Sequence, residues 1–69
     1  MEPHEEIKMI RRALNLTQKE LGAMCDTDAQ TIRRIEMNPD RNTARAPAPR
    51  MLRLIRAYAE GYRPKDWPK

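Results

Sequence analysis

The sequence predicts a small all-α domain of four helices followed by an extended C-terminal tail. The chain has 69 residues, which is room for one small folding unit and excludes two domains. Phe is absent, so the core has to be built from Leu, Ile, Met and Ala, and these residues recur at helical spacing. Pro39, Pro47 and Pro49 interrupt any helix and separate three helical segments from a fourth.

The first helix is predicted over residues 3–14. Pro3 suits an initial helical position, and the glutamates of the first turn and arginines of the last turn complement the helix dipole. The apolar residues that fall on one stripe are Ile7, Ile10 and Leu14. Asn15, which tolerates the left-handed conformation, is placed to end this helix.

The second helix is predicted to start after Thr17, because Thr17-Gln18-Lys19-Glu20 has the pattern of a capping box. It can run only to Met24 or Cys25, since the following Asp26-Thr27-Asp28 offers side chains that prefer turns and caps. A tight turn is therefore expected here.

The third helix is predicted over residues 29–37, with Asp28 as its N-cap. Its spacing turns Ile32 and Ile35 inward. The outward positions are Gln30, Arg33 and Arg34.

A fourth helix is expected after the prolines, with Gly61 placed to end it. The single domain, residues 1–69, then divides into a helix-turn-helix core at 17–37, a basic Pro-rich loop at 38–48, a last helix at 49–60 and a tail at 61–69.

Charge is uneven along the chain. Residues 1–28 carry four Lys or Arg against six Asp or Glu, whereas residues 29–69 carry ten against four. Arg outnumbers Lys ten to four, and guanidinium forks suit phosphates and guanines. The basic second half is the candidate contact surface for nucleic acid, with a merely solvated surface as the alternative.

Two short helices joined by about four turn residues, the second presenting Gln and Arg outward, match the arrangement of a helix-turn-helix DNA reader. Such helices approach closely where they cross. Gly22 in the middle of the second helix costs roughly 1 kcal/mol relative to Ala, which makes sense if a larger side chain cannot fit there.

The segments Thr17–Gly22 and Thr31–Glu36 resemble the Cro/cI-type (XRE, lambda repressor-like) helix-turn-helix family of phage repressors. The resemblance extends upstream through Ile10–Leu16 and downstream through Arg45–Tyr58, so most of the chain is covered. It implies a lambda repressor-like fold and an origin in a phage or mobile element. The family's usual fifth helix is replaced here by the tail.

The turn departs from the family pattern in three places. Asp26 stands where the family often has glycine, Thr27 where it has a Val-like residue, and Cys25 where it commonly has Leu. Because Asp tolerates the left-handed conformation better than most residues, we expect the turn to survive with a slightly poorer core.

The start of the third helix is expected to enter the major groove, which makes Ala29, Gln30 and Arg33 the predicted base-reading residues. Gln pairs with adenine through its amide, Arg forks onto guanine, and the Ala29 methyl suits contact with thymine. Ordinary solvation of a surface helix is the alternative for Gln30 and Arg33.

The predicted phosphate-binding residues flank that helix: Gln18, Thr31, Arg34, Arg41, Arg45 and Arg50. Gln18 matches a family position that contacts a backbone phosphate and braces the recognition helix. Arg41 and Arg45 lie in the loop with which the family clamps the backbone, and Arg50 begins a helix whose first N–H groups lack a side-chain cap. For Arg34, phosphate contact and simple solvation stay open.

Tyr62 and Trp67 in the tail either fold back onto a thin core or bury against a second copy of the chain. We favour the homodimer interface, because two-fold half-sites give one short recognition helix enough contacts. Met24, Met37 and Met51 are expected to fill the core.

No cofactor, metal or small-molecule ligand is expected. Cys25 is the only cysteine and is expected to act as a small buried hydrophobe, while His4, the only histidine, is expected to be exposed. One Cys and one His cannot form a four-ligand zinc site. The chain also lacks a nucleophile–base grouping, a glycine-rich phosphate loop and an apolar membrane span or signal, so we expect a cytoplasmic protein that is not an enzyme.

The function expected is sequence-specific binding of double-stranded DNA as a homodimer on an inverted repeat, with repression by promoter occlusion. Autoregulation of a phage operon fits, including regulators associated with anti-CRISPR genes. Two alternatives stay open: an antitoxin with a DNA-binding domain, and a protein-interaction module that keeps the helix-turn-helix core.

Overall fold

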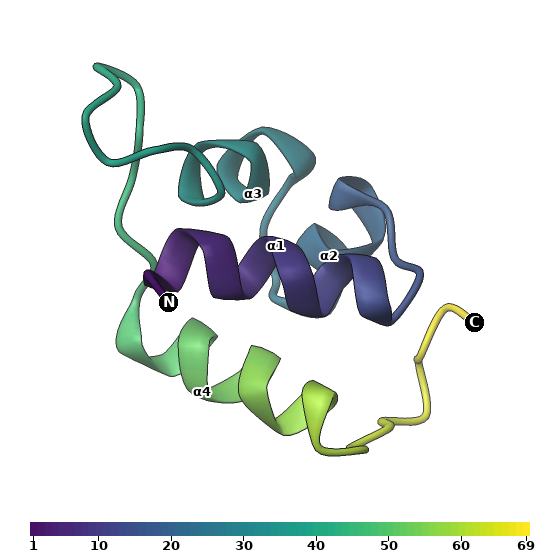
Figure 1. Cartoon of the computed structure of the whole chain (residues 1–69). Coiled ribbons are helices and arrows are strands. Elements are labelled where there is room, and N and C mark those ends of the chain that lie inside the picture. The colour runs from purple at the N-terminus through teal and green to yellow at the C-terminus, as the bar shows by residue number, and fades with distance from the viewer.

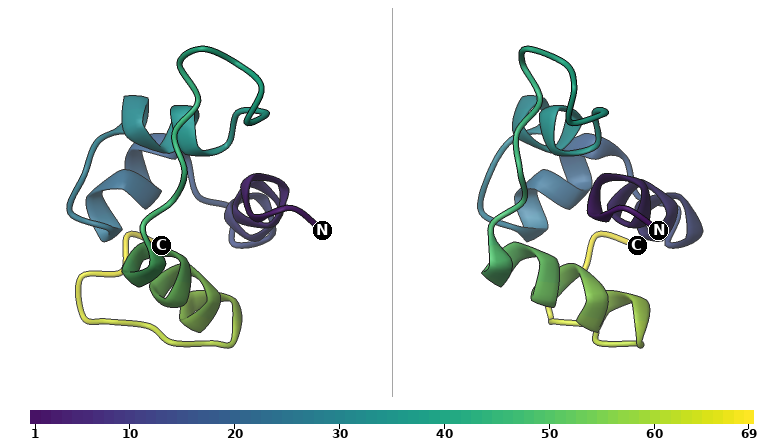
Figure 2. Two further views of the ribbon diagram at one scale, coloured as in Figure 1. Left: turned by 90° about the vertical axis from the view of Figure 1, so that its left-hand side faces the viewer. Right: turned by 60° about the vertical axis from the view of Figure 1, so that its left-hand side comes forward.

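The computed structural model describes all 69 residues, and its regular elements are four helices with no strand. They are α1 (Pro3–Ala13), α2 (Gln18–Met24), α3 (Ala29–Ile35) and α4 (Pro49–Ala59), as Figure 1 shows. The predicted all-α class is confirmed. In the views of Figures 1 and 2, α3 and α4 lie at opposite ends of the molecule, with α1 and α2 between them.

The predicted starts of α2 and α3 are confirmed by their caps. The Thr17 hydroxyl accepts a hydrogen bond from the Glu20 amide at 3.0 Å, and the Glu20 carboxylate accepts one from the Thr17 amide at 2.8 Å. At α3 the Asp28 carboxylate accepts from the Thr31 amide at 2.8 Å. This bond to its charged form is the main reason that the pKa of Asp28 lies below its usual value.

The helix ends differ slightly from the prediction. The largest difference is at α3, which ends at Ile35, two residues before the predicted end at residue 37. There the Met37 amide donates to the Arg34 carbonyl at 3.3 Å, a tighter turn that closes the helix. Met37 is consequently half-buried outside the core, and its sulfur accepts from the Thr43 hydroxyl at 3.4 Å, so its expected core role is wrong.

Left-handed residues make the turns around α2. Asn15 has φ 59° and Asp26 has φ 57°. Asp26 therefore adopts the backbone conformation for which the family often uses glycine, and the expectation that the turn survives the substitution is confirmed.

The core consists of eight buried side chains drawn from all four helices and the α1–α2 turn: Ile7, Ile10, Leu16, Leu21, Ile32, Ile35, Ile55 and Tyr58. Met24, Met51 and Cys25 pack against it, as predicted. Burial, aided by the charge of Asp26, raises the pKa of the Cys25 thiol to about 11, so the thiol stays protonated at neutral pH. Cys25 thus behaves as a small apolar residue.

His4 is not exposed as the sequence predicted. Its side chain is only 15% exposed, and its Nδ1 atom is buried without a hydrogen-bond partner. Two prolines of the segment after α3, Pro39 and Pro47, line the same surface hollow as His4, so this distant segment passes near the first turn of α1.

The tail does not extend away from the domain. Trp67 packs against the core, with its ring edge-on to Tyr58 at a centroid distance of 5.2 Å. The Arg63 guanidinium lies 4.3 Å from the centroid of the Trp67 ring, and the Lys69 ammonium forms an ion pair with Glu20 at 3.1 Å. Residues 61–69 thus fold back from α4 to the start of α2, because this small core gains apolar cover from Trp67.

Tyr62 differs from Trp67 in remaining 52% exposed, although its ring stacks on that of Tyr58 with centroids 5.8 Å apart. The role of Tyr62 and Trp67 in a dimer stays a prediction.

Candidate nucleic-acid interface

α2 and α3 meet at Gly22. A Cβ atom built on Gly22 would lie 2.8 Å from the carbonyl carbon of Asp28 and 2.9 Å from its oxygen, closer than side-chain carbons approach main-chain atoms. The Thr27 amide also donates to the Gly22 carbonyl at 2.8 Å, which fixes the turn between the helices. The prediction that no larger side chain fits at this crossing is confirmed.

A largely buried ion pair holds the end of α3 against α1. Arg11 donates from Nε to Glu36 Oε2 at 2.6 Å and from Nη2 to Glu36 Oε1 at 3.0 Å. The two side chains are only 13% and 4% exposed, and Arg11 Nη1 also donates to the Leu16 carbonyl at 3.0 Å. Such a bidentate pair fixes orientation as well as distance.

Gln18 joins this network, since its Nε2 donates to Glu36 Oε1 at 3.3 Å. The predicted bracing of the recognition helix by Gln18 is confirmed, and its phosphate contact stays a prediction. Sequence reasoning missed the Arg11–Glu36 pair. The signal was present, however, because Arg11 follows the buried Ile7 by four positions and Glu36 follows the buried Ile32 by four. Each charged residue therefore lies on an apolar stripe of its helix.

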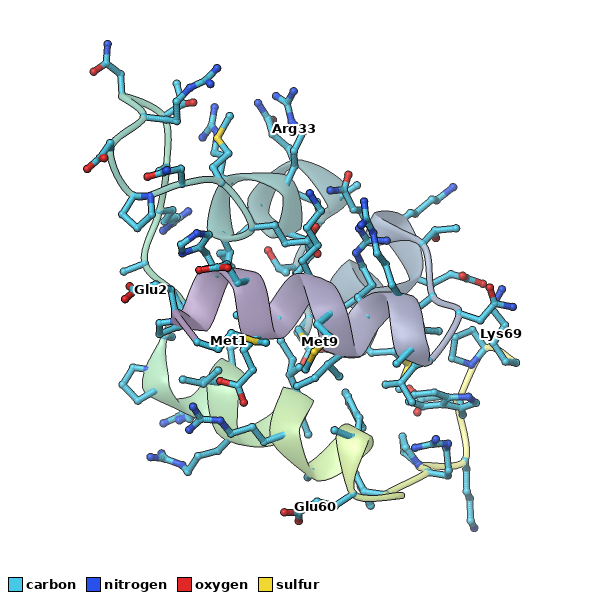
Figure 3. The ribbon with its side chains drawn as sticks, in the orientation of Figure 1. Met1, Glu2, Met9, Arg33, Glu60 and Lys69 are labelled. Atoms are coloured by element: carbon cyan, nitrogen blue, oxygen red, sulfur yellow. The ribbon has the colours of Figure 1, made fainter.

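The outward surface of α3 carries the predicted base-reading residues. Gln30 and Arg33 are both exposed, and Ala29 is half-buried at the first helical position. Figure 3 shows Arg33 projecting from α3 on the side away from α1 and α4. The structure therefore brings Gln30 and Arg33 to one free surface at the end of the molecule.

Thr31 and Arg34 are half-buried on the same helix. The Arg34 guanidinium lies close enough to Asp28 to contribute, after the Thr31 hydrogen bonds, to the lowered pKa of that carboxyl. The Arg34 carbonyl accepts from the Arg45 amide at 3.1 Å, which ties the loop to α3. Arg34 therefore belongs structurally to both the helix and the loop.

The loop at residues 38–48 projects beyond α3 in Figures 1 and 2 and carries Arg41 and Arg45, both exposed. Arg50 is exposed as well, but it lies in the first turn of α4, the helix at the opposite end of the molecule from α3 in Figures 1 and 2. The structure thus brings Arg41 and Arg45 together with α3 and leaves Arg50 apart from them.

The chain contains no group of three or more His, Cys, Asp or Glu side chains placed to hold a metal ion. None of its helices has the length and apolar composition required to cross a membrane.

Comparison with known proteins identifies the family to which the chain belongs. A helix-turn-helix family profile matches residues 7–59, from within α1 to the end of α4, and so covers more than half of the chain. Searches among curated proteins and among solved structures return no match. The matched segment includes the Gly22 crossing, the Arg11–Glu36 pair and the exposed surface of α3. The chain belongs to the Cro/cI-type (XRE, lambda repressor-like) helix-turn-helix family of DNA-binding regulators.

Proposed function

We propose that the protein binds a specific double-stranded DNA sequence as a homodimer and represses transcription by occluding a promoter. The observation that carries this proposal is the pair Gln30 and Arg33, exposed on a helix that is held at its start, its crossing and its end. A helix fixed in this way presents its side chains in one orientation, as reading base edges requires.

Gln30 and Arg33 have the chemistry to discriminate bases. The Gln amide both donates and accepts, which matches adenine in the major groove, and the Arg fork matches guanine. Each good bidentate contact contributes roughly 1–3 kcal/mol of discrimination. Ala29 adds a methyl group at the first helical position, suited to the thymine methyl.

Phosphate contacts would set the register of this helix on the duplex. We assign them to side chains around α3 and in the following segments: Gln18, Thr31, Arg34, Arg41, Arg45 and Arg50. The loop arginines have the strongest support, because the loop projects past α3 while the Arg45 amide anchors it to that helix. Arg50 would serve only if the duplex bends toward α4.

A homodimer on an inverted repeat follows from the size of the reading surface. α3 has seven residues, so one copy can contact only a few base pairs, and a two-fold pair doubles that number. Tyr62, half-exposed beside Tyr58, offers aromatic surface for such an interface. Occupancy set by protein concentration is the simplest control of such a protein, and it suits an autorepressor of a phage or mobile-element operon such as an anti-CRISPR-associated regulator.

The test is selection of binding sites from a random duplex library with the purified protein, followed by sequencing of the retained DNA. We expect an enriched inverted repeat whose half-sites lie about one helical turn apart. The Gln30→Ala variant should lose preference at one position of each half-site, whereas Arg53→Ala, which removes an exposed arginine of α4, should retain the full sequence. A single half-site would overturn the dimer, and no enrichment would overturn sequence-specific binding.

A further inference from the structure

A polar hollow of about 400 Å³ lies beside α3, between that helix, α1 and the loop. Its walls include Lys8 and Arg12 from α1, Arg33 from α3 and Arg41 from the loop, with Met37 as its one hydrophobic residue. Because Arg33 also belongs to the outward surface of α3, the hollow borders the surface assigned above to base reading.

The positive charge of this hollow is not balanced. Its one carboxylate, Glu36, is occupied by Arg11 through two hydrogen bonds. The remaining cations are all exposed and form no ion pair within 4.0 Å: Lys8, Arg12, Arg33 and Arg41. Four free cations from three separate elements therefore surround one concave surface.

A second hollow, of about 700 Å³, adjoins the first and has the opposite charge. Glu2, Glu5 and Asp40 line it, and Lys8 lies on the border between the two hollows. A polyanion that enters the basic hollow is repelled by the neighbouring acidic one. The pair of hollows thus sets the side on which a negatively charged chain can pass α3.

We propose that the basic hollow binds phosphodiester groups of the DNA strand that flanks α3, and that Arg12 and Lys8 of α1 are phosphate-binding residues. The inference rests on the proposed DNA-binding function and extends it to a helix that supplies none of the residues assigned above. Arg12 lines the basic hollow alone, whereas Lys8 also lines the acidic hollow, which partly offsets its charge, so Arg12 contributes more.

The spacing of the two residues supports contact with a nucleic-acid backbone. Lys8 and Arg12 are four positions apart on α1, a rise of about 6 Å. One strand of B-DNA carries a phosphate about every 3.4 Å of axis, so the two side chains span about two phosphates. A single free phosphate ion would leave one of the cations unused.

The experiment measures the affinity of the full chain for its selected duplex and for a random duplex between 50 and 200 mM salt. Arg12→Ala should weaken both complexes alike and lower the slope of log affinity against log salt by about 0.9. The affinity gap between wild type and Arg12→Ala then narrows about threefold over this salt range. Arg12→Ala with Lys8→Ala should lower the slope further, and Arg12→Lys should retain the wild-type slope.

Arg53→Ala is the matched control, because Arg53 is an exposed, unpaired arginine of α4 outside both hollows. Circular dichroism of each variant checks folding, which the exposed side chain of Arg12 should not affect. The inference would be overturned if the salt slope of Arg12→Ala equalled the slopes of wild type and Arg53→Ala. In that case the proposed function would still stand, provided that wild type binds its selected duplex in preference to random DNA.

A further measurement separates DNA backbone from free phosphate as the ligand. Inorganic phosphate is titrated into the free wild-type protein at constant ionic strength, and we expect no saturable binding. Saturable phosphate binding that disappears in the Arg12→Ala variant, together with a DNA salt slope that this variant leaves unchanged, would assign the hollow to free phosphate and overturn the inference. If the wild-type protein enriches no DNA site at all, the proposed function is refuted independently of the salt slopes.

Discussion

Replacing Gly22 by alanine should destabilise the domain even though alanine is the better helix former. The added Cβ would meet the carbonyl carbon and oxygen of Asp28 at 2.8 and 2.9 Å and the amide nitrogen of Ala29 at 3.2 Å. All three are main-chain atoms at the start of α3, so no flexible side chain can move aside. The clash has to be relieved by shifting one helix against the other.

The magnitude follows from two opposing terms. Overfilling a packed contact costs typically 1–3 kcal/mol, and a contact with fixed main-chain atoms belongs at the upper end. Alanine returns about 1 kcal/mol of helix propensity. The expected net loss in the free energy of unfolding is therefore about 2 kcal/mol, which lowers the ratio of folded to unfolded molecules about 30-fold.

Urea unfolding followed by circular dichroism measures this loss. The control is Ala23→Gly, an exposed position in the same helix where only propensity changes, with an expected loss of about 1 kcal/mol. The shift of α3 should also weaken binding to the selected duplex in Gly22→Ala molecules that remain folded. A Gly22→Ala protein as stable as wild type would refute the close approach of α2 and α3.

Arg33→Ala should reduce affinity for the selected duplex far more than affinity for random DNA, and equal losses on the two duplexes would exclude base reading by Arg33. Arg45→Ala should instead weaken binding to both duplexes alike and lower the slope of log affinity against log salt by about one. Glu36→Ala leaves a buried guanidinium unpaired and should cost about 3–5 kcal/mol in the free energy of unfolding, measured in urea; a loss below 1 kcal/mol would contradict the burial of the pair. Hydrogen bonds from Arg56 hold the pKa of Glu6 below its usual value. The ionised Glu6 carboxylate therefore stabilises the fold at a pH above its pKa in the unfolded chain, which is about 4.3. This stabilisation is lost as the pH falls from there through the lower pKa of Glu6 in the folded protein. The stability difference between wild type and Glu6→Gln should accordingly shrink between pH 6 and pH 3, and a difference independent of pH would argue against the ion pair.

The helix starts were predictable from the sequence because they depend on neighbouring residues. The capping box at Thr17 and the cap at Asp28 act over three positions, and their hydrogen bonds form as predicted. Gly22 was predictable for a related reason, since its cost in a helix interior demanded a compensating close contact. The residues Gln30 and Arg33 were placed correctly on the outward surface by helical periodicity alone.

The features that sequence reasoning missed depend on contacts between distant segments. Arg11 and Glu36 are 25 positions apart, and pairing them requires knowing that α1 passes the end of α3. His4 lies near the segment after α3, and Trp67 returns to Tyr58. Exposure was predicted for His4, and contact with a second copy was favoured over a fold-back for Trp67, but both side chains are covered by their own chain through a path that local pattern does not encode.

The short length of α3 links DNA recognition to temperature. Helices of seven residues do not persist in water on their own, and α3 is held by Asp28, by the contact at Gly22 and by the bond between Glu36 and Arg11. These supports come from separate parts of the chain and exist together only in the folded domain. The protein should therefore release bound DNA over the same temperature interval in which it melts, so that heating alone would lift the proposed repression.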